Sequence, residues 1–255
     1  MSLIENHKLA VLIDADNAQA AIAAELLAEI AKYGIASVKR AYGDWTTSRL
    51  NGWKDHLHKH AIQPMQQFSY TQGKNSTDSS LIIDAMDLLH TARFDGFCLV
   101  SSDSDFTRLA TRLRESGMTV YGFGEKKTPI SFISACDKFI QTEILRTQFQ
   151  LVSDGDDVEN RETLKDILTT SINAISRDDE DGWVTLSGVG GYISKNHSSF
   201  DSRNYGCLKL GELVHKQSFI EVKAVPDHSN KIHIYVRLKN QATLENQNEF
   251  IEKVL

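Results

Sequence analysis

Apolar runs alternate with amphipathic segments along the first 145 residues. The strand-like runs lie at residues 8–13, 35–43, 61–68, 96–103 and 118–124. Apolar positions with helical spacing lie at residues 18–34, 46–60, 79–92 and 106–117. This alternation predicts an α/β domain, in which a parallel sheet has helices on both faces. Pro64 restricts the run at 61–68 to an edge strand or a bulge.

The pattern changes near residue 151, where the polar and acidic stretch "SDGDDVENRE" begins. Three amphipathic segments follow it, and then two strand-like runs, "FIEVKAV" and "KIHIYVRL". Three helices followed by a β-hairpin are typical of a winged helix, a small α+β domain. The predicted organisation is an α/β domain at 1–150, a linker at 151–160, a winged helix at 161–240 and a tail at 241–255.

Two of the apolar runs end in paired carboxylates. Asp14 and Asp16 follow the first run, and the run at 96–103 ends in Asp103, with Asp105 two residues later. The carboxyl ends of parallel strands lie at one edge of the sheet, where ligands of such folds bind. One aspartate after a strand is explained by capping of the next helix. Four at one edge favour a binding site.

A further aspartate, Asp78, begins the helix predicted at 79–92 and is expected at the same edge. Capping is again the alternative explanation. Asp84 and Asp87 lie further along this helix and, at about 100° per residue, cannot all face the same point as Asp78. We therefore predict Asp78 as the third ligand position, and Asp84 and Asp87 mainly as solvated residues.

Carboxylates that lie close together repel one another, and a cation removes this penalty. Hard divalent ions such as Mg²⁺ prefer oxygen ligands. No Cys/His set has the spacing of a zinc site, and the pair His56 and His60 is typical of a surface. Several carboxylates around Mg²⁺ or Mn²⁺ suit hydrolysis of a phosphodiester bond.

Composition limits how a polyanion can bind. The 255 residues carry a formal net charge of −6, so no global basic field attracts nucleic acid or a membrane. A polyanion would have to bind to a local basic patch. In the segment 39–74, basic residues are interleaved with aromatic ones. These residues are Lys39, Arg40, Tyr42, Trp45, Arg49, Trp53, Lys54, Lys59, Tyr70 and Lys74. Such a patch grips single strands by phosphate contact and stacking; the alternative is that Trp45 and Trp53 belong to the core.

The three cysteines are far apart in the sequence, which argues against a disulfide framework. The chain shows neither a signal peptide nor an apolar run long enough to cross a membrane. We expect a cytoplasmic protein without membrane contact.

The stretches "VLIDADNAQ", "KNSTDSSLIIDAMDLL" and "DGFCLVSSDSDFTRLATRLRESGMTVYGFG" resemble the NYN domain, a nuclease fold related to PIN domains. The resemblance covers residues 9–145. It implies that Asp14, Asp78, Asp103 and Asp105 are the metal-binding acidic positions and that Asn17 is the polar residue beside the first of them. The implied activity is metal-dependent cleavage of RNA.

The stretches "DGWVTLSGVGGYI" and "SSFDSRNYGCLKLGELV", followed by the predicted hairpin, resemble the OST-HTH or LOTUS domain. The resemblance covers residues 161–238. In that family the domain binds RNA or a protein partner. Phe200 and Tyr205 are expected to anchor the third helix of this domain in its core.

These observations lead to one hypothesis, an endoribonuclease dependent on Mg²⁺ or Mn²⁺ that a C-terminal winged helix directs to single-stranded or structured RNA. Asp14, Asp78 and Asp103 would hold the metal, and Asp105 a second ion or the attacking water. Substrate contacts are predicted from Asn17, Lys74, Trp45 and Arg49.

Two alternatives stay open. One is a non-catalytic RNA-binding adaptor. The other is a phosphatase of the haloacid dehalogenase kind, whose DxDx[TV] motif is broken here by Ala18. A protein partner of the winged helix and a homodimer are further open alternatives.

Overall fold

The structure of the chain is a computed structural model that describes residues 7–68, 76–91, 93–146, 158–176, 182–227 and 229–239. The chain divides into two compact units, Met1–Leu151 and Val152–Leu255. Residues 151–157 of the predicted linker and the predicted tail, 241–255, lie outside the described residues.

The first unit alternates strands and helices. Its strands are β1 (Lys8–Asp14), β2 (Ile35–Gly43), β3 (Gln63–Gln66), β4 (Gly96–Val100), β5 (Thr119–Gly124) and β6 (Lys138–Gln141). Its helices are α1 (Ala23–Ile30), α2 (Lys54–His60), α3 (Ser76–His90), α4 (Thr107–Glu115), α5 (Ile130–Ala135) and α6 (Glu143–Arg146).

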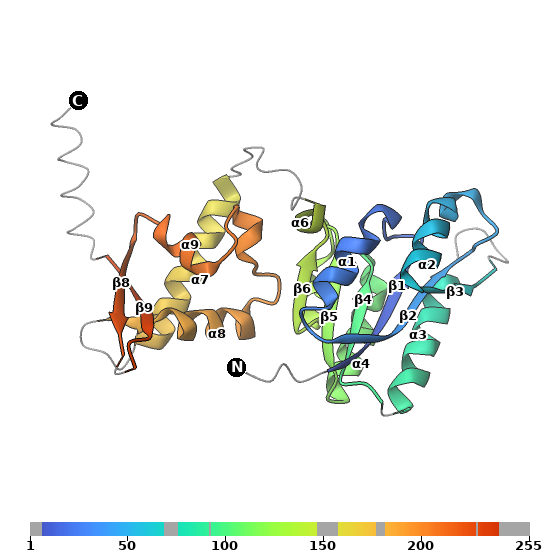
Figure 1. The fold of residues 1–255 in the computed structure, drawn as a ribbon, viewed down its shortest axis with the longest axis horizontal. Helices are drawn as coiled ribbons and strands as arrows, with labels where there is room; N and C mark the ends of the chain where they lie inside the picture. The colour runs from blue at the N-terminus through green and yellow to red at the C-terminus, as the bar shows by residue number, and fades with distance from the viewer. Residues whose placement is uncertain are drawn as a thin grey trace. The chain divides into compact units, whose positions relative to one another are not determined.

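The six strands form one parallel sheet in the order β3-β2-β1-β4-β5-β6 (Figure 1). Alternate residues of the central strand β1 enter two different hydrophobic clusters. Leu9, Val11 and Ile13 pack with α1, whereas Ala10 and Leu12 pack with α3 and α4. Because β1 is buried on both faces, its sequence is a continuous apolar run. The predicted parallel sheet with helices on both faces is confirmed.

The short strand β3, which contains Pro64, lies at one edge of the sheet, as predicted. The helix predicted at 46–60 is wrong in its first half. A 3-10 helix spans Ser48–Trp53, and the α-helix α2 begins only at Lys54. Asn51 and Gly52 have low helix propensity, which accounts for the late start of α2.

The second unit contains the helices α7 (Val158–Ile175), α8 (Leu186–Asn196) and α9 (Leu210–His215). Its strands are β7 (Val184–Thr185), β8 (Ile220–Pro226) and β9 (Ile232–Leu238), which form an antiparallel sheet in the order β7-β9-β8. The helices and one face of this sheet enclose a separate core, so the predicted small α+β domain is confirmed. Phe200 and Tyr205 pack against this core with their ring centroids 5.8 Å apart.

Among the helices in the described parts of the chain, none has the length and apolar composition of a membrane span.

Candidate active site

The carboxyl ends of β1 and β4 meet at one edge of the parallel sheet. The two strands are neighbours, with Ile13 opposite Val100. Asp14 is the last residue of β1, and Ser101 follows β4 directly. The Ser101 hydroxyl donates a hydrogen bond of 2.8 Å to Asp14 Oδ2. Strand pairing therefore brings the two acidic strand ends together.

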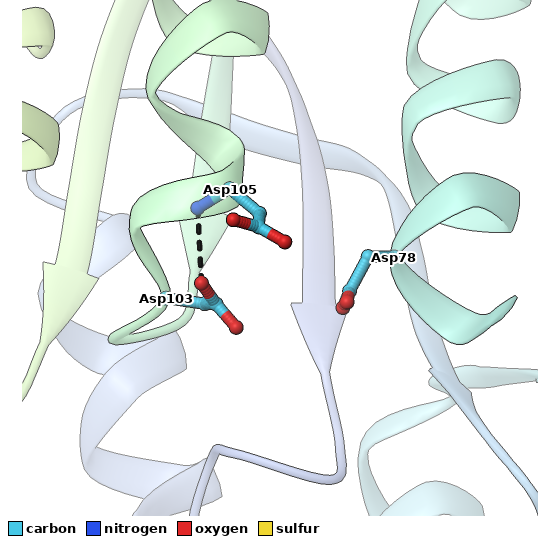
Figure 2. A group of neighbouring side chains, drawn as sticks. All are labelled: Asp78, Asp103 and Asp105. Atoms are coloured by element: carbon cyan, nitrogen blue, oxygen red, sulfur yellow. Dashed lines mark hydrogen bonds between the residues drawn. The ribbon is translucent and has the colours of Figure 1, made fainter. Parts of the chain in front are cut away.

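Three carboxylates gather at this edge. Asp78 lies in the first turn of α3, Asp103 in the loop after β4, and Asp105 in the 3-10 turn Ser104–Phe106 before α4. Each offers an oxygen atom, and these three atoms all lie within 4.8 Å of one another. Figure 2 shows the Asp78 side chain, from α3, near the side chains of Asp103 and Asp105. Asp78 and Asp103 are half-buried and Asp105 is exposed, so the group is open to solvent.

Asp103 also organises the backbone of its loop. Its carboxylate accepts a hydrogen bond of 2.9 Å from the Asp105 backbone N–H, drawn as a dashed line in Figure 2. The backbone N–H of Asp103 donates to Ser101 Oγ over 3.1 Å. Capping thus occurs at Asp103 rather than at Asp105. A carboxylate has several acceptor positions, so this cap is compatible with metal binding.

Asp14 is fully buried beside this group. Its Oδ2 accepts hydrogen bonds from Asn17 Nδ2 over 2.7 Å and from Ser101 Oγ. Its Oδ1 is also buried and has no hydrogen-bond partner among the described residues. Burial raises the pKa of Asp14, the hydrogen bonds from Asn17 and Ser101 lower it, and the charge of Asp16 raises it again. A buried carboxylate oxygen without a partner is costly unless a cation is near it.

The structure groups the predicted ligands differently from the sequence hypothesis. The hypothesis joined Asp14 with Asp78 and Asp103 and gave Asp105 a separate task. In the structure Asp78, Asp103 and Asp105 form the close group, and Asp14 is linked to Asp103 through Ser101. All the donor atoms in question are carboxylate oxygens, which fits Mg²⁺ or Mn²⁺.

Electrostatic repulsion in this cluster is largest at Asp78. Burial and then the charges of Asp14, Asp103, Asp105 and Asp16 raise the pKa of Asp78 to about 6. The ordinary value is 3.8, so the folded metal-free protein binds this proton more tightly than the unfolded chain. Folding is therefore penalised increasingly as the pH rises from about 4 to about 6, and the penalty persists above that range.

Asp78→Asn is expected to stabilise the metal-free protein at neutral pH. The neutral amide removes the repulsion, and the gain should be about 1–2 kcal/mol at about pH 7.5, after a discount for solvent screening, and close to zero at about pH 4. Thermal unfolding in EDTA at both pH values measures it. Asp87→Asn, on the exposed side of α3, is the matched control. Equal melting temperatures of the Asp78 variant and the wild type at neutral pH would contradict the repulsion.

The predicted substrate residues have different surroundings. Asn17 is bound to Asp14, and Arg49 is exposed. Trp45 is partly buried, and its indole Nε1–H donates to the Met65 carbonyl over 3.1 Å. Lys74 lies outside the described residues.

Other members of the basic and aromatic segment serve the fold. Trp53 and Tyr42 are buried in the core, with 3% and 0% of their surface exposed. Arg40 pairs with Asp84, and the Tyr42 hydroxyl donates to the same carboxylate. The prediction that Asp84 is mainly solvated is therefore wrong. Asp84 ties α3 to β2, at the strand end where Tyr42 is paired with Asp14.

Sequence reasoning missed two parts of this edge. Ser101 was detectable, because it follows the apolar run Gly96–Val100 directly and precedes Asp103 by two residues. Gly124, at the end of β5, was not, because its role depends on a contact with another strand. A Cβ at Gly124 would lie 2.5 Å from the Ser101 carbonyl oxygen, so only glycine allows β5 to approach the loop that carries Asp103.

Family models match two parts of the chain, the NYN domain at residues 8–145 and the OST-HTH/LOTUS domain at residues 159–232. A search of curated proteins finds no match.

Two solved structures resemble parts of the chain. A protein of unknown function from Vibrio parahaemolyticus is 19% identical over 55% of this chain and 94% of its own, with a TM-score of 0.46. A fragment of a Chromobacterium violaceum protein, solved by NMR, is 41% identical over 31% of this chain and 82% of its own, with a TM-score of 0.26. Because the NYN match spans more than half of the chain, from the first strand to α6, the chain belongs to the NYN domain family.

Proposed function

We propose that the chain is a metal-dependent endoribonuclease, in which the NYN domain cleaves RNA and the OST-HTH domain binds it. The observation that carries the proposal is the convergence of Asp78, Asp103 and Asp105 within 4.8 Å at the open edge of the sheet. The matches to both domain families support the substrate class.

In this proposal Asp78, Asp103 and Asp105 hold Mg²⁺ or Mn²⁺. When bound, the ion would neutralise charge on the scissile phosphate and lower the pKa of the attacking water. Asp103 fixes the loop because its carboxylate accepts a hydrogen bond from the Asp105 backbone N–H, and Ser101 connects this loop to Asp14. Asp14, with its unpartnered Oδ1, adds negative charge behind the triad and is the candidate for a fourth ligand.

Asn17 and Ser101 keep Asp14 in one orientation, because both donate to the same carboxylate oxygen. The substrate has to approach from the exposed side of Asp105. The pocket next to Ser101 and Asn17 has a volume of about 10 Å³, room for about one water molecule and too little for a nucleotide.

Incubation of the wild type and Asp14→Asn with single-stranded and structured RNA, in Mn²⁺ or in EDTA, tests the proposal. We expect cleavage only by the wild type with metal, because the amide removes one of the charges that attract the cation. The Asp87→Asn variant is the control for surface charge and should cut like the wild type. Equal cleavage by Asp14→Asn, or cleavage in EDTA, would overturn the proposed site. RNA binding without cleavage would favour the adaptor.

A further inference from the structure

The second unit has a sheet face that its hydrophobic core does not use. In the hairpin, Val222 and Ile234 pack on the core and Val236 is fully buried within it. Successive side chains of a strand point to opposite faces. Lys223, Tyr235 and their neighbours at odd positions therefore lie on the outer face of β8 and β9.

Two cations meet an indole ring on this face. Lys223 Nζ lies 4.0 Å from the centroid of the Trp183 ring, and Arg237 Cζ lies 4.7 Å from it. Lys223 also lies 5.7 Å from the Tyr235 ring, on the paired position of β9. We call these four residues the cation–aromatic face. Lys223 is exposed and the other three are partly exposed.

The part of this unit that carries the face is basic, although the unit as a whole is acidic. Residues 182–239 contain eight Lys and Arg and four Asp and Glu, a formal net charge of +4, whereas the whole unit, residues 152–255, contains twelve Lys and Arg and seventeen Asp and Glu and sums to −5. One acidic neighbour, Glu221, accepts a hydrogen bond of 2.7 Å from Arg237 Nε and fixes that guanidinium on the sheet. Cations beside aromatic rings are the combination that binds single-stranded nucleic acid, because every base has a face that can stack.

The other candidate surface is α9, at the position of a recognition helix. It has only six residues, and Leu213 and Val214 are buried. The deep, narrow major groove of A-form RNA does not admit side chains that read bases, so a helix of this kind has little to contact there. Lys209 and Lys216, which flank α9, are exposed and can serve as controls.

We propose that the cation–aromatic face binds single-stranded RNA, with bases stacked on Trp183 and Tyr235 and phosphates contacting Lys223 and Arg237. This inference rests on the proposed function, since RNA is the substrate there. It goes beyond the OST-HTH match, which ends at residue 232, before Tyr235 and Arg237.

The test measures binding of a labelled, unstructured RNA of about a dozen nucleotides to the full chain. Asp103→Asn serves as the parent, so that the RNA is not cut. Tyr235→Ser should weaken binding about tenfold, through the loss of stacking. Tyr235→Phe keeps the ring and should bind like the parent.

Lys223→Gln should weaken binding and reduce its salt dependence. The double variant Lys209→Gln/Lys216→Gln is the control and should bind like the parent. Thermal unfolding of each variant checks that it is folded.

The outcomes separate this inference from the proposed function. If the parent binds RNA and the Tyr235 and Lys223 variants bind equally well, this face is not the RNA site, while cleavage by the wild type upholds the proposed function. Weaker binding by the Lys209/Lys216 control alone would move the site to α9. If the parent binds no RNA, this inference is overturned and a protein partner is favoured. If the wild type also cuts no RNA, the proposed function is overturned as well.

Discussion

Asp103→Asn is expected to abolish stabilisation by Mn²⁺ and to lower RNA cleavage by roughly 100-fold or more. The wild type should gain about 2.7 kcal/mol when the free metal is at 100 times its Kd, since an ion that binds only the folded state stabilises it. Asparagine keeps an oxygen that can accept from the Asp105 N–H, and it is as good a cap as aspartate. The variant therefore removes charge while leaving the loop intact.

Melting temperatures with Mn²⁺ and with EDTA, measured beside cleavage rates, test this expectation. Asp103→Ala separates the two tasks of the residue, because it loses the cap as well and should also melt earlier in EDTA. An Asp103→Asn protein that still gains stability from Mn²⁺ would show that the ion binds elsewhere.

Asp84→Ala is expected to destabilise the protein by about 2–4 kcal/mol, because it leaves the Arg40 guanidinium and the buried Tyr42 hydroxyl without their carboxylate. For a protein of this size, that corresponds to a drop of roughly 5–15 °C in melting temperature. The side chains of Arg40 and Asp84 are 23% and 17% exposed, so solvent replaces the lost contacts only in part.

Thermal unfolding in EDTA measures this effect. Asp87→Ala removes the same charge from an exposed site on α3 and should shift the melting temperature little. Tyr42→Phe should lower the free energy of unfolding by only about 1 kcal/mol, since Asp84 keeps its ion pair with Arg40. The Asp84 variant should also bind Mn²⁺ more weakly, because α3 carries Asp78. A loss of stability no larger than that of Asp87→Ala would contradict the structural role of Asp84.

The parallel sheet and the position of its acidic edge were predictable because each depends on a local pattern. β1 and β4 are continuous apolar runs; β1 ends in Asp14, and two serines separate the end of β4 from Asp103. Once the strands are parallel and adjacent, Asp14 and Asp103 have to lie at one edge. The start of α3 follows from the same connectivity, which explains why Asp78 was expected there.

What could not be predicted depends on contacts between segments that are distant in the sequence. Asp84 has the periodicity of a surface residue, and only the packing of α3 on β2 gives it Arg40 and Tyr42 as partners. Whether Asp14 or Asp105 joins Asp78 and Asp103 is a matter of side-chain reach, which residue spacing does not determine. The cation–aromatic face unites Trp183 with residues about 40 and 50 positions later, through antiparallel pairing.

The edge strand β3 affects how copies of the NYN domain can associate. It has four residues, and one of them, Pro64, carries no N–H. A strand of another copy would meet a short edge that lacks one backbone N–H donor. Extension of the sheet from one copy to the next along β3 is therefore disfavoured. Association of two copies at this border would have to rest on side-chain contacts instead.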